Sequence, residues 1–319
     1  MKLAILGPGF WGATLTWMLT DNFDRITLWG LPEVISKPLC VELDKKIELS
    51  ADLEKAVKNA DIILLAVATS GIRDVCQKIA KIGVNSTQII VNASKGIELP
   101  TLLRMSEVIK EELPASPVVI LSGPTLAKEV LAGLPTAASV ACEDIETAKK
   151  VQKLLTVPGK FRLYSNSDVI GVELGGSLKN VIAIASGFAD AMKLGDNCRG
   201  ALLTRGMAEM VRLSTKLGAK SSTLYGLSGM GDLIATCSSP LSRNYTVGSL
   251  LGKGKKIDDI LSELGSVAEG VKTSKAVSEL AKKLGVEVPI SSAIYEAVYT
   301  DITPQEVLDK LMNRELKEE

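Results

Sequence analysis

A lysine lies in the middle of a long apolar stretch of the sequence. Residues 169–194 are mostly apolar, and the only charged residues among them are Glu173, Lys179, Asp190 and Lys193. Such a stretch predicts one long helix that is apolar on nearly every side, and helices of that kind lie in protein interiors. At 3.6 residues per turn, the face that carries Lys179 otherwise holds only apolar and small residues. We therefore expect a buried ammonium group at position 179.

The sequence contains no histidine. This excludes Ser-His-Asp chemistry and histidine-ligated metals, so any proton transfer near neutral pH falls to Lys, Asp, Glu, Tyr or Cys. Lys179 is the first candidate, with Asn180 beside it. Gly175 and Gly176 precede it by one turn, and each costs roughly 1 kcal/mol relative to alanine in a helix, which suggests a need for space. The helix pattern alone is equally consistent with a lysine that has no catalytic role. Such a lysine would extend its side chain to the surface or pair with a buried acid.

A second group of candidate residues follows the first apolar segment of the chain. Residues 2–6 predict a short strand, and Gly7-Pro8-Gly9-Phe10-Trp11-Gly12 connects it to a helical segment at 13–20. This is G-x-G-x-x-G between a strand and a helix. Gly7 permits the tight turn, Gly9 lets a pyrophosphate approach the helix N-terminus, and Gly12 allows close packing of helix on strand. The motif predicts that NAD or NADP binds here.

The acidic residue that usually recognises the cofactor ribose is missing from the expected position. The strand predicted at 25–29 ends without Asp or Glu, and Trp29-Gly30-Leu31 follows, with Lys37 nearby. Both NAD and NADP therefore remain open as cofactors.

Alternating strands and helices continue to about residue 166 and predict a doubly wound α/β domain over 1–166. We expect Ser50 to cap a helix that ends at Lys58, and further strands at 61–67, 88–92, 118–121, 137–141 and 162–164. Lys95 follows one of these strands, and Gly123 and Thr125 follow the next. Open α/β sheets bind ligands at these carboxyl ends.

Residues 167–319 carry no further strand pattern and predict an all-helical second domain. Helices are expected at about 168–193, 198–217, 242–251, 256–263, 270–284, 289–298 and 303–312. A glycine-rich loop at 226–232 ends in Asp232. Another segment presents Ser242, Arg243 and Asn244 at a helix start, which suits a phosphate dianion, although an arginine taken alone is more often a surface ion-pair residue.

Composition excludes several classes of function. Lys+Arg and Asp+Glu balance at 37 each, which gives no electrostatic reason to expect nucleic acid or an anionic membrane as a partner. The N-terminus lacks the apolar core of a signal peptide, so we expect a cytoplasmic protein. Five scattered cysteines without a C-x-x-C pair predict neither disulfides nor a zinc site, and no metal site is expected.

Several motifs occur in a fixed order, and through them the chain resembles the bacterial NAD(P)-dependent glycerol-3-phosphate dehydrogenases over essentially its whole length. They are Gly7–Gly12, Asn92–Gly96, Ser122–Thr125, Glu173–Val181, Thr204–Gly206, Gly229–Leu233, Ser242–Asn244 and Val267–Gly270. The resemblance implies a Rossmann-like domain followed by a helical domain. It also implies reversible reduction of dihydroxyacetone phosphate to sn-glycerol 3-phosphate for phospholipid synthesis, by a cytoplasmic homodimer.

The same resemblance implies roles for individual residues. Lys179 is the implied proton donor and acceptor. The implied substrate contacts are Lys95, Gly123, Thr125, Lys179, Asn180, Asp232, Ser242, Arg243 and Asn244. The implied cofactor contacts are Gly7, Gly9, Phe10, Trp11, Gly12, Lys95, Ala127, Arg243, Val267 and Glu269. The sequence departs from the family at Leu31, where the family often has a basic residue or histidine, and is shorter over 31–47.

Two other functions compete with this one. A β-hydroxyacid dehydrogenase of related fold would use a buried lysine on a carboxylate substrate without a phosphate site. A regulatory protein that binds NAD(H) without catalysis would be indifferent to the loss of Lys179.

Overall fold

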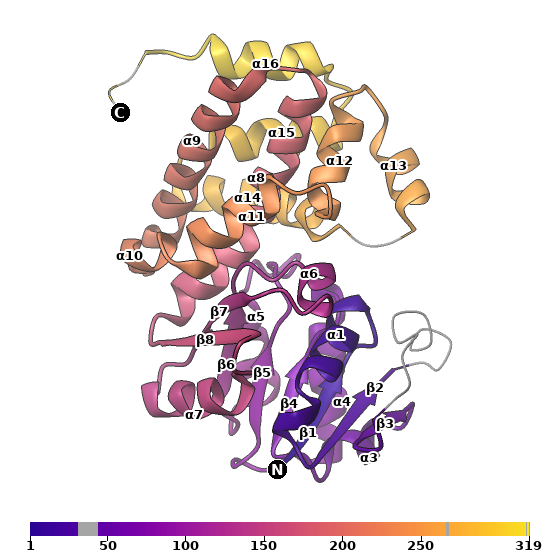
Figure 1. Cartoon of the computed structure of the whole chain (residues 1–319). Coiled ribbons are helices and arrows are strands. Elements are labelled where there is room, and N and C mark those ends of the chain that lie inside the picture. The colour runs from indigo at the N-terminus through magenta and orange to yellow at the C-terminus, as the bar shows by residue number, and fades with distance from the viewer. Residues whose placement is uncertain (31–43, 266–267, 317, 319) are drawn as a thin grey trace. The chain divides into compact units, whose positions relative to one another are not determined.

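The computed structural model describes residues 1–30, 44–265, 268–316 and 318 (Figure 1). Its contacts divide the chain into two compact units, residues 1–173 and 174–319. The division falls inside a single long helix, α8 (Val169–Ala191). The functional boundary expected after residue 166 lies a few residues earlier and stays a prediction.

The first unit is built on one sheet of eight strands in the order β3-β2-β1-β4-β5-β6-β7-β8. Within the described residues, all neighbouring strands pair in parallel except β6 and β7. The expected doubly wound domain is therefore confirmed, with the strand order 3-2-1-4-5-6 typical of dinucleotide-binding folds. The strands are β1 (Lys2–Leu6), β2 (Arg25–Trp29), β3 (Ile47–Ser50), β4 (Ile62–Leu65), β5 (Ile89–Asn92), β6 (Val118–Ser122), β7 (Thr136–Ala141) and β8 (Phe161–Asn166).

Both faces of this sheet are buried, because successive side chains of a strand point to opposite faces. Leu3 and Ile5 of β1 join the hydrophobic core under one group of helices, namely α1 (Phe10–Met18), α6 (Ala127–Leu131) and α7 (Ile145–Leu155). Ala4 and Leu6 join the core under the other group, α3 (Leu53–Val57), α4 (Ile72–Ile82) and α5 (Met105–Glu112). This double burial explains why the strands are apolar at nearly every position.

One helix cap in this unit differs from the prediction. Ser50 is the last residue of β3 and does not begin a helix. Asp52 caps α3 instead, because its side chain accepts a hydrogen bond from the backbone N–H of Lys55. Serine and aspartate are both good N-cap residues, and the pairing of β3 with β2 decides between them.

Residues 174–265 and 268–316 of the second unit contain helices and no strand, as predicted. Besides α8, these are α9 (Gly195–Lys216), α10 (Ser221–Leu224), α11 (Asp232–Cys237), α12 (Arg243–Leu251), α13 (Ile257–Leu264), α14 (Glu269–Leu284), α15 (Pro289–Tyr299) and α16 (Pro304–Met312). Within the described part of the chain, α8 is also the one helix long and apolar enough to cross a membrane. However, 94% of the residues in its most apolar 18-residue window are buried, as in the core helix of a soluble protein.

The prediction of a loop at 226–232 is wrong. Leu227–Gly231 forms a turn of π-helix that continues directly into α11. Its glycines serve close packing: a Cβ atom at Gly229 would lie 1.9 Å from the carbonyl oxygen of Leu224. Glycine density therefore predicted a loop where the fold requires close approach of two backbone segments.

A buried carboxylate joins two helices of this unit. Glu209 of α9 accepts hydrogen bonds from the backbone N–H groups of Ile290 (2.6 Å) and Ser291 (3.1 Å), and from the Ser291 hydroxyl (2.9 Å). It thus satisfies the free N–H groups at the start of α15. Burial raises the pKa of Glu209, although these hydrogen bonds act in the opposite direction.

The raised pKa predicts a pH-dependent stability. Below the ordinary value of 4.5, Glu209 is protonated in the folded and unfolded chains. As pH rises further, the unfolded chain ionises first, so the free energy of unfolding falls until the folded pKa is passed. Urea unfolding at a series of pH values should show this decline relative to Glu209→Gln.

Glu306 provides the matched control, because hydrogen bonds from Thr303 lower its pKa. Relative to Glu306→Gln, wild-type stability should fall when pH drops through the folded pKa. If both carboxyl groups changed the free energy of unfolding with pH in the same direction, the raised pKa of Glu209 would be contradicted.

Candidate active site

The turn after β1 has the geometry of a nucleotide-binding loop. Gly7 has φ +118°, and a Cβ atom there would lie 2.6 Å from the carbonyl oxygen of Ala66. A Cβ atom at Gly12 would lie 2.0 Å from the carbonyl oxygen of Gly7. Gly9, in contrast, is exposed, and nothing lies within 4 Å of its Cβ position. The first and third glycines of the motif are therefore fixed by packing, whereas the second leaves room for a ligand.

The helix that follows this turn can receive an anion. Gly9 is the N-cap of α1, and no side chain of the described residues caps the helix there. Its first turn holds no acidic residue, Phe10 is 40% exposed, and Trp11 packs partly against the core. Free N–H groups and the helix dipole at such an end suit a pyrophosphate. The residues present thus fit the pyrophosphate of NAD or NADP.

Three of the predicted substrate residues of the first unit lie together. The ammonium Nζ of Lys95 donates a hydrogen bond to the carbonyl oxygen of Gly123 (2.9 Å) and contacts Thr125 Oγ1 at 3.5 Å. Lys95 follows β5, and Gly123 follows β6, its parallel neighbour in the sheet. Ala127 is partly buried at the start of α6. The carboxyl ends of neighbouring strands therefore bring Lys95, Gly123 and Thr125 together.

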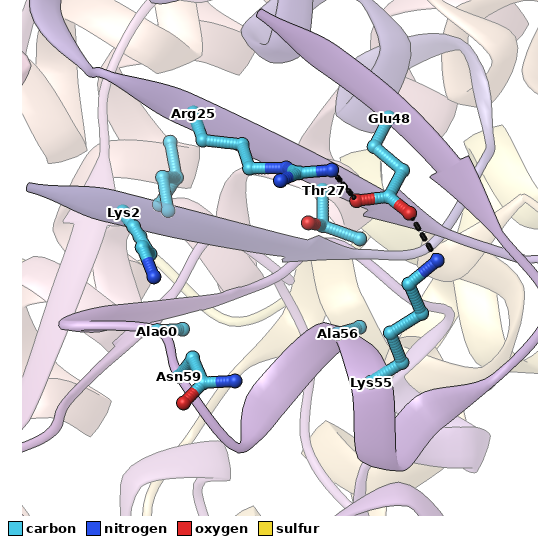
Figure 2. A pocket seen from close by; sticks show the side chains of 9 residues that line it. Lys2, Arg25, Thr27, Glu48, Lys55, Ala56, Asn59 and Ala60 are labelled. Atoms are coloured by element: carbon cyan, nitrogen blue, oxygen red, sulfur yellow. Dashed lines mark hydrogen bonds and ion pairs between the residues drawn. The ribbon is translucent and has the colours of Figure 1, made fainter.

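A small hollow lies at the opposite, amino edge of the same sheet. Its volume is about 120 Å³. Figure 2 shows the charged side chains that line it, among them Lys2, Arg25 and Glu48. Arg25 Nη2 lies 2.6 Å from Glu48 Oε2, and Lys55 pairs with the other oxygen of the same carboxylate. Its basic groups at Arg25 and Lys55 are thus already neutralised in part, and none of the predicted site residues lines it.

In the second unit, Lys179 is buried, with 7% of its surface exposed. Its Nζ donates hydrogen bonds to Asp232 Oδ1 (2.8 Å) and Thr236 Oγ1 (2.6 Å), and the Thr236 hydroxyl in turn donates to Asp232 Oδ1 (3.1 Å). The interpretation of a surface-reaching lysine is therefore wrong, whereas pairing with a buried acid is what the structure shows. An ammonium carries three hydrogens, and within the described residues only two of them have acceptors. The third is available to a substrate oxygen.

Thr236 was not identified from the sequence. It follows Asp232 by four residues in α11, so both side chains lie on one face of that helix. The signal was hidden because residues 226–232 predicted a loop and α11 was not expected. The neighbouring Cys237 does not compete as a proton carrier, because burial raises its pKa to about 12.

The expected space beside Lys179 is partly filled by protein. A Cβ atom at Gly175 would lie 2.6 Å from the carbonyl oxygen of Ser228. Gly175 therefore lets α8 approach the π-turn that precedes α11, and the backbone of Ser228 occupies the space that its missing side chain leaves.

The predicted phosphate-binding residues stand at the start of α12. Ser242 is the N-cap, and its side chain accepts a hydrogen bond from Tyr245 N. The Arg243 side chain is exposed, and its guanidinium has no hydrogen bond or ion pair with any described residue. Its guanidinium is therefore available to an external anion.

Asn180 and Asn244 are engaged with other helices. Asn244 Nδ2 donates to Asn180 Oδ1 (2.9 Å), and Asn244 Oδ1 accepts from Gly270 N (3.0 Å). Asn244 thus connects α8, α12 and α14. Glu269 is the first residue of α14, whereas Val267 and Leu31 lie outside the described residues.

Comparison with known proteins places these residues in one family. Residues 2–148 match the family described as NAD-dependent glycerol-3-phosphate dehydrogenase N-terminus, and residues 168–309 match the corresponding C-terminus family. A glycerol-3-phosphate dehydrogenase [NAD(P)+] of Lysinibacillus sphaericus is 42% identical over 339 aligned residues, which cover 100% of this chain and 98% of that protein. One of Thermoanaerobacter sp. is 42% identical over 329 residues, with 100% and 99% covered.

A solved structure agrees with these sequence matches. The crystal structure of glycerol-3-phosphate dehydrogenase from Coxiella burnetii superposes with a TM-score of 0.92 at 33% identity, and 98% of this chain and 99% of that chain are covered.

Proposed function

The chain belongs to the NAD-dependent glycerol-3-phosphate dehydrogenase family, and we propose that it catalyses the reversible reduction of dihydroxyacetone phosphate to sn-glycerol 3-phosphate with NADH or NADPH. The observation that carries the proposal is the buried ammonium of Lys179, which two acceptors hold and whose third N–H is not engaged by any residue that the structure describes. A carbonyl reduction needs a proton at the carbonyl oxygen, and this group can supply it.

Lys179 acts in two ways on the carbonyl oxygen. Its free N–H donates a hydrogen bond and stabilises the negative charge that develops there, and the ammonium then transfers its proton to that oxygen. Asp232 and Thr236 hold the amine in place, so the N–H vector is fixed before the substrate arrives. In the reverse reaction the neutral amine accepts the proton from the alcohol.

Residues of the first unit hold the dinucleotide. The backbone around Gly9 and the first turn of α1 bind its pyrophosphate, Phe10 and Trp11 flank it, and Ala127 completes the contacts from this unit. The bound nicotinamide supplies the hydride. Lys95, beside Gly123 and Thr125, contacts both the cofactor and the substrate.

Arg243 binds the substrate phosphate. A guanidinium at a helix N-terminus offers a planar pair of N–H donors together with the positive end of the helix dipole. Ser242 and Asn244 flank it, and Asn180 adds a polar group beside Lys179.

We further propose a cytoplasmic homodimer that supplies glycerophospholipid synthesis. Its relatives carry the designation [NAD(P)+], and the sequence after Trp29 leaves the choice between the two nucleotides to measurement.

The test is the loss of absorbance at the nicotinamide band when dihydroxyacetone phosphate is added with NADH or, in parallel, NADPH. We expect turnover with at least one of them, and the two KM values give the preference. Turnover of a carboxylate substrate with no activity on the phosphorylated ketone would favour a β-hydroxyacid dehydrogenase. Cofactor binding without any turnover would favour a regulator.

A further inference from the structure

Helices α8 and α12 pack in a single register. Asn180 of α8 accepts a hydrogen bond from Asn244 of α12, 64 positions later in the chain. One turn further along both helices, a Cβ atom at Gly248 would lie 1.8 Å from the carbonyl oxygen of Ile184. The two residues of this pair are again 64 positions apart in the chain, and each lies four residues after its counterpart in the first pair. The two helices therefore run side by side in the same direction, with their i, i+4 rows in contact.

This contact involves backbone atoms on both sides. A Cβ atom at Gly187 would lie 2.0 Å from the carbonyl oxygen of Tyr245, and one at Gly252 would lie 2.7 Å from that of Phe188. Backbone atoms cannot move aside by changing a side-chain rotamer. Sliding α12 along α8 by one residue would bring larger side chains against these carbonyl groups, so the register resists displacement.

A polar contact ties the same two helices together farther along α8. The Tyr245 hydroxyl, in the first turn of α12, donates a 2.5 Å hydrogen bond to Asp190 Oδ2. Arg199 of α9 holds the other oxygen of this carboxylate, with its Nη2 at 2.7 Å. The bond to the carboxylate raises the pKa of Tyr245, so the hydroxyl keeps its proton. Hydrogen bonds to ionised acceptors are roughly twice as strong as neutral ones.

The groups proposed to act on the substrate, Lys179 and Arg243, both lie at the end of this arrangement where Asn180 contacts Asn244. Asp190 follows Lys179 in α8 by about three turns, or about 16 Å, on the same face of the helix. Arg243 immediately precedes Asn244, whose amide contacts the residue that follows Lys179. The position of α12 on α8 therefore sets the separation between the Lys179 ammonium and the Arg243 guanidinium.

We propose that Tyr245, acting through Asp190, is a positioning residue that holds α12 in this register and so matches the enzyme to the distance between the carbonyl and the phosphate of its substrate. The inference rests on the proposed function. A phosphate bound by Arg243 places the carbonyl oxygen against Lys179 at one separation only. If α12 is held less firmly on α8, the bound phosphate should contribute less to substrate binding, whereas the Lys179 ammonium should be unaffected.

Tyr245→Phe tests this, because it removes the hydroxyl and keeps the aromatic ring. We expect KM for dihydroxyacetone phosphate to rise about tenfold, in line with the loss of one hydrogen bond to a charged group. The kcat should stay within about twofold, because Lys179 and its partners are unchanged, and KM for the nicotinamide cofactor should not move.

Tyr299→Phe is the matched control. The Tyr299 hydroxyl donates a 3.0 Å hydrogen bond to the Val271 carbonyl oxygen and so joins α15 to α14. The variant therefore loses a similar hydrogen bond elsewhere in the same unit. The KM for dihydroxyacetone phosphate should be unchanged in this variant. An equal rise in both tyrosine variants would overturn the proposal, because it would indicate a general loss of rigidity.

A double-mutant cycle identifies the route of the effect. In an Arg243→Ala background, Tyr245→Phe should cause no further rise in KM, because the tyrosine acts through the arginine. Independent, additive effects would overturn the positioning role, as would an unchanged KM in Tyr245→Phe itself. Failure of the proposed function looks different: wild-type protein would then not reduce dihydroxyacetone phosphate with either nucleotide.

Discussion

Replacing Lys179 by glutamine should lower kcat for dihydroxyacetone phosphate reduction by about 10²–10⁴-fold, the usual contribution of a positioned acid–base group. Glutamine can still donate hydrogen bonds toward Asp232 and Thr236, but it has no proton to transfer at neutral pH. The variant is preferable to Lys179→Ala, which would remove the ammonium partner of the buried Asp232 carboxylate and destabilise the unit by about 3–5 kcal/mol. Steady-state kinetics at saturating substrate measures the effect.

Two controls separate chemistry from folding. The dissociation constant for NADH, measured by fluorescence titration, should stay within about twofold, because the glycine turn after β1 is untouched. Lys216→Ala removes an exposed lysine from α9 of the same unit and should leave kcat unchanged. A near-normal kcat in Lys179→Gln would show that another group delivers the proton.

Replacing Arg243 by alanine should raise KM for dihydroxyacetone phosphate about 10- to 100-fold, with a smaller change in kcat. Hydrogen bonds to charged groups contribute about 1.5–3 kcal/mol, and about 1.4 kcal/mol corresponds to a factor of ten. Arg243 is exposed and without a partner among the described residues, so the substitution should not disturb the fold. Initial rates over a range of substrate concentrations give both parameters.

Arg243→Lys should give an intermediate KM, because lysine keeps the charge and loses the planar pair of donors. Arg212→Ala is the control, since Arg212 is also exposed but binds the carbonyl oxygen of Glu287. If Arg243→Ala leaves KM unchanged, the phosphate is bound elsewhere.

The sequence alone determined those features that depend on local pattern. The strand, the Gly7–Gly12 turn and the helix after it are contiguous, and the two-residue and 3.6-residue periods distinguish the α/β domain from the helical one. The apolar surroundings of Lys179 likewise predicted that its ammonium would be buried, because every residue that sets the character of its helix face lies within two turns.

Only the tertiary structure decided what these residues touch. Thr236 was missed because α11 was not expected, and the 226–232 loop was wrong because this segment packs against Gly175 of α8, a contact between distant residues that no local pattern reveals. The choice of Asp52 over Ser50 as a cap depended on strand pairing. The register of α12 on α8 joins residues 64 positions apart in the chain. Hydrogen-bond partners and backbone contacts of this kind are set by packing between distant segments, so periodicity and spacing predict the elements but not their register.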